Sequence, residues 1–421
     1  MSNLFALIDC DNFFVSCERL FRPDLNCRGI VVLSSNDGCV VSRSQEAKAL
    51  GIPMGAPAFL YRHFFRDHDI VVFSANFELY GDISRRLLSY LTSLTPSVEA
   101  YSVDEAFVGL AGITAHNWQK WGQSVRTEIN REIGIPVSIG IANTKTLAKL
   151  AAWHAKRTPD LGGVLQLDPT GIMHYLAETP LEEIWGVGRR LAPRLKAAGV
   201  HTALDVQRLR PRFAEQLMGL HGRQLVSELS GQSSHPIADN NQPRKSIMHG
   251  RMFGEDTTDW TVIEAAAVTL TAKATLRLRR EGLLAKRAGI FISTNRHKPG
   301  YRRWFEQIRL EPPTADGGSI AEQLLLALRK EIHATIAFHR LSILLDELTS
   351  DKWLQTSLLK SQSPQLIALS GRRLQAVDSL NNRYGPRMVR YAAEDLSASW
   401  QPKRALRSPR YTTEWSELPI I

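Results

Sequence analysis

Three carboxylates beside short apolar segments could bind divalent metal ions. Asp9 follows the apolar run Phe5–Ile8, which is typical of a buried strand whose end meets solvent or a ligand. Asp104 and Glu105 are adjacent, so both can face one site only at a strand end or a hairpin, where the pleat is broken. Carboxylate oxygens suit Mg²⁺, and two ions about 3.5–4 Å apart can bind the attacking and leaving oxygens of an in-line displacement. The pattern indicates phosphoryl or nucleotidyl transfer, although Asp-Glu pairs also occur on solvated turns.

A mixed α/β unit is expected to position these carboxylates. Residues 1–22 and 80–170 predict strands separated by helical patterns, and the strands are Phe5–Asp9, Glu99–Ser102 and Val137–Ile141. Between the two parts lies an insertion, residues 23–79, which contains turn residues from Pro23 to the Gly51–Gly55 loop.

Residues 171–235 are helical in pattern and contain a possible phosphate-binding turn. Gly186 and Gly188 could form a tight turn whose backbone N–H groups face a phosphate at a helix start. Pro193 is tolerated only in the first turn of a helix, so the following helix should begin near Arg190. A plain turn remains the alternative for this glycine pair.

A linker at residues 236–243 precedes a basic region. Residues 244–309 contain 14 Lys or Arg against 6 Asp or Glu. Arg277, Arg279 and Arg280 lie close to the apolar segment Ile290–Thr294, which predicts a basic helix next to a strand edge that could bind phosphates. A solvated charged helix is the alternative.

Composition fits a polyanionic partner. The chain has 421 residues, a formal net charge of +10 and a hydrophobic fraction of 43%, as expected for a globular protein of two to four domains. No apolar run approaches the roughly 20 residues of a membrane span, and no basic segment precedes an apolar one at the N-terminus. The four cysteines and the histidines lack metal-ligand spacings. We therefore expect a cytoplasmic protein that binds nucleic acid rather than membranes.

Several segments resemble, in order, the Y-family of translesion DNA polymerases. They are Phe5–Glu18, Ser35–Val40, Glu46–Gly51 and Tyr101–Phe107, and Lys403–Thr413 is similar to the UmuC branch of that family. The resemblance covers essentially the whole chain. It implies an α+β multidomain fold like a right hand, with a palm (1–22 and 80–170), fingers (23–79), a helical thumb with a helix-hairpin-helix (171–235), a linker (236–243), a little finger (244–349) and a C-terminal tail (350–421).

The same resemblance implies the roles of the site residues near the first strand. Asp9, Asp104 and Glu105 would be the catalytic ligands of two Mg²⁺ ions, which Mn²⁺ can replace, with the backbone carbonyl of Cys10 as a further ligand. Asp11 shares a strand face with Asp9, but the family motif does not use it. Phe14 matches the steric gate against a ribose 2′-OH and Phe13 stacks nearby, while burial in the core is the alternative for this pair.

Further roles follow from the resemblance outside that strand. Lys48, Lys156 and Arg43 would bind the triphosphate, and Ser102 would orient the adjacent carboxylates. Lys145 and Lys149 are expected to touch substrate or primer. The predicted DNA contacts are Gly186, Gly188, Arg277, Arg279 and Arg280. The loose segment containing Gln355, Leu358 and Leu359 could bind a sliding clamp, although such matches arise by chance.

The sequence therefore predicts an error-prone DNA-directed DNA polymerase for translesion synthesis in the SOS response. Its expected partners are primer–template DNA, dNTP, a UmuD′-type subunit, a RecA-type recombinase and the β sliding clamp. Two alternatives remain. A two-metal nuclease with a helix-hairpin-helix would share the carboxylates but has no use for an aromatic gate, and a catalytically lapsed DNA-binding subunit would not need the intact carboxylates.

Overall fold

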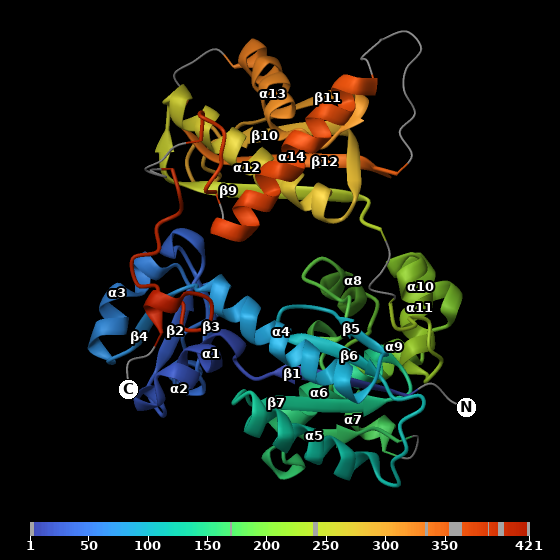
Figure 1. Ribbon diagram of the computed structural model, residues 1–421. Coiled ribbons are helices and arrows are strands. Elements are labelled where there is room, and N and C mark those ends of the chain that lie inside the picture. Colours follow the sequence, from blue (N-terminus) through green and yellow to red (C-terminus); the bar gives the residue numbers. More distant parts are fainter. Residues whose placement is uncertain are drawn as a thin grey trace. The chain divides into compact units, whose positions relative to one another are not determined.

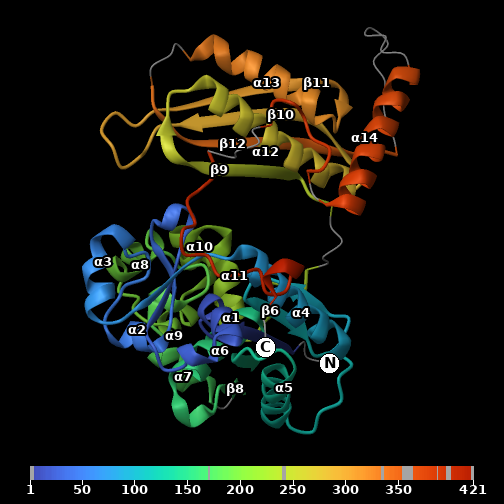
Figure 2. The same ribbon diagram turned by 60° about the vertical axis from the view of Figure 1, so that its left-hand side comes forward.

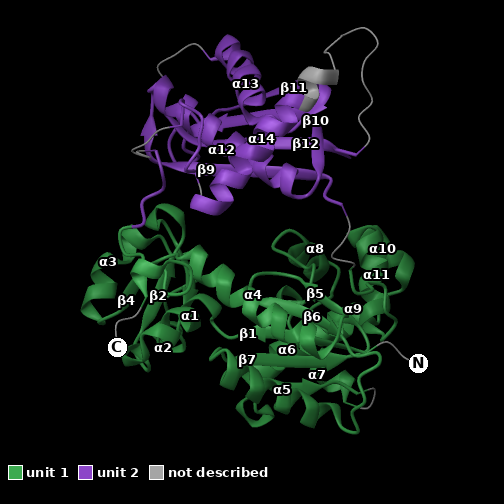
Figure 3. Cartoon of the chain, in the orientation of Figure 1, with its two compact units in different colours: residues 1–241, 405–421 green, residues 242–404 purple. Residues whose placement is uncertain are grey.

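The computed structural model describes residues 4–168, 171–238, 243–332, 336–352, 364–385, 387–394 and 400–418. The chain divides into two compact units, one of residues 1–241 with 405–421 and the other of residues 242–404 (Figure 3). The boundary at 241/242 lies inside the predicted linker, and the last residues of the chain return to the first unit. Among the described residues, no helix combines the length and the apolar character needed to cross a membrane.

A five-stranded sheet forms the centre of the first unit (Figure 1). Its strands, in spatial order, are β5 (Val98–Ala100), β6 (Glu105–Gly109), β1 (Phe5–Cys10), β7 (Val137–Ala142) and β8 (Val164–Gln166). Strand β1 pairs antiparallel with both β6 and β7, while β7 and β8 are parallel. The helices of this region are α1 (Phe13–Phe21), α4 (Phe77–Leu94), α5 (Trp118–Glu132) and α6 (Lys145–Arg157).

Alternate residues of β1 enter two different cores, as the period of two in a strand requires. Ala6 and Ile8 pack with α1, α4 and α5, whereas Phe5 and Leu7 pack with α6 and the helical region that follows. Asp9 continues the second set and therefore points to the α6 side of the sheet. Helix α6 lies close to that face because Gly140 of β7 has no side chain: a Cβ there would be 2.1 Å from the Ala148 carbonyl oxygen.

The insertion at residues 23–79 has a small sheet and a core of its own. Its strands, in spatial order, are β3 (Val40–Arg43), β2 (Ile30–Leu33) and β4 (Val71–Ser74), and its helices are α2 (Gln45–Ala49) and α3 (Ala58–Asp67). Apolar side chains such as Val31, Ile52 and Phe65 fill the core of this insertion.

The region 171–235 is helical, as expected. Its helices are α7 (Ile172–Glu178), α8 (Leu191–Ala197), α9 (Ala203–Gln207), α10 (Pro211–Met218) and α11 (Leu220–Leu229). The N-cap of α8 is Arg190, and Pro193 lies in its first turn, so the predicted start of this helix is confirmed. Short 3₁₀ helices occur at Pro23–Leu25, Ser35–Asp37, Pro159–Leu161, Leu181–Glu183 and Trp415–Glu417.

The second unit is a four-stranded antiparallel sheet covered on one face by helices (Figure 2). The strands, in spatial order, are β11 (Arg303–Thr314), β10 (Leu283–Ser293), β12 (Phe338–Ser350) and β9 (Ser246–Thr257). Its helices are α12 (Trp260–Arg280), α13 (Gly317–Glu331) and α14 (Pro364–Tyr384). Side chains of α12 and α13 share one core with Ile290, Ile292, Leu341 and Ile343.

Two predicted details of the strands are wrong. Ile290–Thr294 was expected at a strand edge, but β10 lies between β11 and β12, because its partners come from later parts of the chain. The strand Glu99–Ser102 ends early, at Ala100, because the N–H groups of Tyr101 and Ser102 both donate to the Glu105 carbonyl in a tight hairpin turn.

Candidate active site

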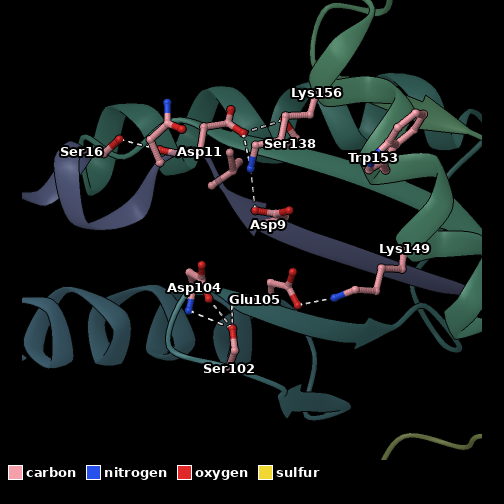
Figure 4. Close-up of polar contacts among 12 residues, drawn as sticks. Asp9, Asp11, Ser16, Ser102, Asp104, Glu105, Ser138, Lys149, Trp153 and Lys156 are labelled. Carbon is pink, nitrogen blue, oxygen red and sulfur yellow. Dashed lines mark hydrogen bonds and ion pairs between the residues drawn. The ribbon is translucent and has the colours of Figure 1, made fainter. Parts of the chain in front are cut away.

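The three carboxylates lie on two neighbouring strands and face one another (Figure 4). Asp9 and Glu105 are directly paired across β1 and β6, so their side chains emerge on the same face. Asp104 precedes β6 in the hairpin turn, and its carbonyl accepts a hydrogen bond of 2.9 Å from the Cys10 N–H. The broken pleat at the hairpin thus places adjacent Asp104 and Glu105 toward the same gap, as the sequence predicted.

Ser102 organises this turn. Its hydroxyl oxygen accepts hydrogen bonds from the N–H groups of Asp104 (3.2 Å) and Glu105 (3.0 Å), and the hydroxyl donates to the Asp104 carboxylate. One short side chain therefore fixes both the backbone and one carboxylate.

Helix α6 supplies the cations that contact the other two carboxylates. Its first turn is capped by Thr144, whose oxygen accepts from the Leu147 N–H. Lys149 Nζ lies 2.6 Å from a Glu105 oxygen, and Lys156 Nζ lies 3.0 Å from Asp9 and 3.1 Å from Asp11. The two lysines are two helical turns apart, so they share the face of α6 that covers the sheet.

The turn after β1 holds two groups that sequence reasoning did not place in the site. Asp11 accepts a hydrogen bond of 2.9 Å from the Ser138 hydroxyl in addition to the Lys156 contact. Asn12 adopts a left-handed conformation, with φ of 49°, and its side-chain oxygen accepts a hydrogen bond of 2.5 Å from Lys48 Nζ. Asparagine tolerates this conformation better than most residues, which was the one available signal for Asn12.

Two opposing effects set the pKa values in the site: burial of the charged groups and their pairing with opposite charges. Burial raises the pKa of Asp9 to about 6, despite the opposing effect of Lys156. Burial lowers the pKa of Lys156, but the nearby charges of Asp9 and Asp11 outweigh it, so the pKa of Lys156 is raised overall. Burial is thus the main reason that the Asp9 carboxylate resists ionisation, and a cation bound beside Asp9 would offset that cost.

The predicted triphosphate-binding residues come from distant segments and converge. The pKa of Lys48 is lowered by burial and then by repulsion from Lys156, Arg43 and Arg157. Arg43 donates to the Ile52 carbonyl at 2.5 Å, and its buried Nε has no hydrogen-bond partner within the described residues. Arg157 was not singled out from the sequence, although it directly follows Lys156. Four cations that repel one another in this way suit a polyanionic ligand.

The carboxylates are suitable ligands for divalent ions, although they are not already arranged in a binding geometry. Among the described residues, no three or more His, Cys, Asp or Glu side chains are already gathered closely enough to bind an ion. Yet Asp9, Asp104 and Glu105 offer hard oxygen ligands on one face, and no lysine in the described part of the chain contacts Asp104, unlike the other two. These three residues, with the backbone carbonyl of Cys10, would hold the ions.

The aromatic pair at the start of α1 divides between core and site. Phe13 is buried in the core. Phe14 is half-buried: its ring stacks on Tyr80, with centroids 4.5 Å apart, and meets the edge of Phe77 at 6.1 Å. The core alternative thus holds for Phe13, and the gate role of Phe14 stays a prediction.

The remaining predicted contacts have different outcomes: one is wrong, one has the expected backbone geometry, and one group lies outside the described residues. The expectation that Lys145 touches substrate is wrong, because this lysine is buried in an ion pair with Glu99 and donates to the Pro236 carbonyl at 2.7 Å. Gly186 has a φ of +88°, as a tight glycine turn requires. The clamp-binding residues Gln355, Leu358 and Leu359 lie outside the described residues.

The three arginines at the end of α12 are engaged within the second unit. Arg279 makes a bidentate pair with Asp378 of α14, at 2.7 and 2.8 Å. Arg277 contacts Glu281 at 3.1 Å, and Arg280 donates to Asn382 at 3.2 Å. DNA contact by these residues stays a prediction, and for Arg279 it would require breaking a largely buried pair.

Comparison with known families matches most of the chain. Models of the impB/mucB/samB family match residues 8–153, those of its C-terminal domain match residues 244–358, and those of its helix-hairpin-helix motif match residues 169–200. The chain is 34% identical to Protein SamB and to Protein UmuC of Salmonella typhimurium, with 99% of each chain covered in both cases. The chain belongs to the impB/mucB/samB family.

The chain resembles solved polymerases in fold. A Y-family DNA polymerase chimera of Dbh and Dpo4 superposes with a TM-score of 0.66, at 22% identity, covering 82% of this chain and 99% of that one. The chain is also 28% identical to DNA polymerase IV of Desulfatibacillum aliphaticivorans over 93% of its length and 96% of the relative. The protein therefore has the Y-family polymerase fold, as predicted. Residues 374–421 match a domain of unknown function.

Proposed function

We propose that this protein is a DNA-directed DNA polymerase that performs error-prone translesion synthesis in the response to DNA damage, by two-metal nucleotidyl transfer. The observation that carries the proposal is the site at the end of β1. There Asp9, Asp104 and Glu105 face one gap, and Lys48 and Lys156 lie beside it.

The chemistry would divide between the carboxylates and the cations. When bound to Asp9, Asp104, Glu105 and the Cys10 carbonyl, Mg²⁺ ions would activate the attacking hydroxyl and stabilise the leaving oxygen. Lys48, Arg43 and Lys156 would bind the triphosphate and offset the charge that develops on pyrophosphate. Ser102 keeps the Asp104 carboxylate oriented before any substrate arrives, because it bonds both the carboxylate and the turn backbone.

The small fingers support low selectivity for the base pair. Their core is built from three short strands and two helices, so they offer little bulk against the nascent pair, and discrimination by shape would be weak. The likeness to SamB, ImpB, UmuC and MucB proteins supports cooperation with a UmuD′-type subunit, a recombinase filament and the sliding clamp in the cytoplasm.

The alternatives lose support from the same geometry. A nuclease would have no use for an aromatic gate at Phe14, and a lapsed subunit would not need Asp104 fixed by Ser102 in the turn. Neither competitor accounts for the convergence of Lys48 from the fingers on the turn after β1.

Single-nucleotide insertion on a primed template with Mg²⁺ tests the proposal. Asp104→Asn is the sharpest variant, because no lysine among the described residues would lose a partner with it. We expect insertion to fall by at least about 100-fold, since losing a ligand should exceed the loss of an outer-shell partner. Asp160→Asn, at an exposed carboxylate outside the site, serves as the matched control and should retain activity.

The assay should include the sliding clamp and an activated UmuD′-type partner, so that dependence on partners is not mistaken for inactivity. Primer shortening would instead support the nuclease, and absence of extension under all conditions would support the lapsed subunit. Equal activity of the natural chain and Asp104→Asn would remove Asp104 from the catalytic set.

A further inference from the structure

The C-terminal segment, residues 405–418, packs on the first unit although it follows the second unit in sequence (Figure 3). The N–H of Ala405 donates to Asp37 at 3.1 Å. Leu406 and Ser74 exchange two hydrogen bonds, of 2.9 Å from the Leu406 N–H to the Ser74 hydroxyl and 3.0 Å from the Ser74 N–H to the Leu406 carbonyl. The segment therefore continues from the end of β4 toward the start of α4.

Ser408 anchors this segment in the interior of the first unit, and only 5% of the surface of Ser408 is exposed. The side-chain amide of Asn76 donates to the Ser408 carbonyl (3.0 Å), the Ser408 hydroxyl (2.9 Å) and the Pro409 carbonyl (3.0 Å). Asn76 is itself fully buried and caps α4, since its oxygen accepts from the Leu79 N–H. The C-terminal segment thus fixes the residue that starts α4.

A second path runs through a buried carboxyl group. The Ser408 hydroxyl donates to Glu18 at 3.1 Å, and the Tyr80 hydroxyl donates to the same Glu18 oxygen at 2.5 Å. Glu18 is 0% exposed, and its other oxygen has no hydrogen-bond partner among the described residues. Two hydroxyl groups, one of them from the C-terminal segment, therefore hold this side chain.

Both paths end at the ring of Phe14. Phe14 and Glu18 are four residues apart on α1, so they lie on the same face of that helix. Tyr80 and Phe77 lie in the first turn of α4, which Asn76 caps, and both rings pack against Phe14. Ser408 is thus separated from the Phe14 ring by Glu18 and Tyr80 alone.

We infer that Ser408 is a positioning residue for sugar selection, and that the C-terminal segment sets how firmly the Phe14 ring is held against a ribose 2′-OH. This inference rests on the proposed function. An aromatic ring can exclude a hydroxyl group by its volume only if the ring cannot move aside. To move aside, the Phe14 ring would have to displace the Tyr80 ring on which it stacks. The inference gives the end of a domain of unknown function a role in the nucleotide site.

Sugar selectivity tests the inference in the full-length chain. The measured quantity is the ratio of kcat/KM for a dNTP to kcat/KM for the matching rNTP. We expect Ser408→Ala to lower this ratio by about fivefold, comparable to one hydrogen bond, with dNTP insertion nearly unchanged. Arg410→Ala is the matched control: it removes an ion pair with Glu417 within the same segment and leaves the Ser408 hydrogen bonds to Asn76 and Glu18 in place.

A double-mutant cycle separates positioning from general loosening. Phe14→Ala should raise rNTP use by more than Ser408→Ala, and adding Ser408→Ala to Phe14→Ala should change the ratio no further, because the two act through one ring. Equal losses for both sugars, or an equal effect of Arg410→Ala, would overturn the inference.

Hydrogen exchange supplies a measurement that needs no turnover. Amides in residues 14–18 and 77–80 should exchange faster in Ser408→Ala than in Arg410→Ala. If the natural chain extends no primer but this contrast appears, the proposed function fails and the link from Ser408 to α1 and α4 stands. If the natural chain extends primers and the contrast is absent, the inference fails and the polymerase remains.

Discussion

Individual side chains in this site do two tasks, and the lysines show this best. Lys156 contacts Asp9 and Asp11 while belonging to the cation group around Lys48. An ammonium group that already touches a ligand-type carboxylate keeps that carboxylate charged and in place. Replacing Lys156 would therefore disturb the carboxylates as well as the triphosphate, whereas Asp104 can be replaced without that side effect.

Glu18 allows a prediction about pH at the scale of one residue. Burial raises the pKa of Glu18 above its ordinary value of 4.5. The stabilisation by its protonated form is fully present below the unfolded-state pKa and is lost as the pH rises through the folded-state pKa. We expect the free energy of unfolding of the natural chain, minus that of Glu18→Gln, to fall as the pH rises above 4.5, by about 1.4 kcal/mol for each tenfold difference between the acid dissociation constants of the folded and unfolded states.

Chemical denaturation at a series of pH values measures this difference. The same series on Glu132→Gln, at an exposed carboxylate of α5, serves as the reference. A constant difference for Glu18→Gln would contradict the prediction.

At the scale of elements, the contact between β7 and α6 determines whether the α6 lysines reach the carboxylates. A Cβ at Gly140 would meet the Ala148 oxygen at 2.1 Å and the Ala152 nitrogen at 2.2 Å, both backbone atoms. We expect Gly140→Ala to lower the free energy of unfolding by about 3 kcal/mol through overpacking. It should also reduce insertion, because α6 must move away from the sheet.

A glycine in an open position provides the control for that variant. Gly81 lies inside α4, and an added methyl group there would meet no described atom within 4 Å apart from the nearby backbone of its own helix, so Gly81→Ala should be neutral or stabilising by up to about 1 kcal/mol. Denaturant titration measures the free energy of unfolding of both variants. Similar changes for Gly140→Ala and Gly81→Ala would contradict the packing argument.

The sheet of the second unit carries another prediction. Arg303, Phe305, Gln307 and Arg309 alternate with the buried side of β11, so they lie on the face opposite α12 and α13. We expect Arg303→Ala to weaken DNA binding and to reduce the slope of log affinity against log salt by about 0.9, as for one phosphate contact. Affinity measured across a salt series tests this.

Arg279→Ala is the paired control for the salt slope. Because Arg279 is paired with Asp378 inside the unit, its loss should lower stability by about 1 to 3 kcal/mol and leave the slope unchanged. A reduced slope for Arg279→Ala with none for Arg303→Ala would reverse the assignment of the DNA-binding face.

The sequence correctly predicted those features that depend on steric constraints between neighbouring residues. Pro193 fixed the start of α8, and the adjacency of Asp104 and Glu105 required the hairpin that the structure contains. Contacts between residues that are distant in sequence could not be predicted in this way. The sequence near Arg279 does not indicate its partner Asp378, 99 residues later. The sequence near Asn76 likewise does not indicate Ser408, 332 residues later. The position of β10 inside its sheet depends on pairing of the same long-range kind.

At the scale of the whole molecule, the chain passes between its two units twice, at 241/242 and at 404/405. The second unit has its own core around α12, α13 and its sheet, while the C-terminal segment contributes Tyr411 to the core of the first unit, stacked on Phe21 at 4.6 Å. Because the cores are separate, we expect calorimetry to resolve two unfolding transitions.

Deleting residues 405–421 should lower the midpoint of one of these transitions alone. The deletion removes the Ser408 hydrogen bonds and the Tyr411 stack from the first unit, whereas the contacts of the second unit stay intact. Trp400→Ala, at a buried side chain of the second unit, is the reciprocal control and should lower the other midpoint. If both changes shift a single common transition, the two units unfold as one, and the C-terminal segment cannot be treated as a part of the first unit alone.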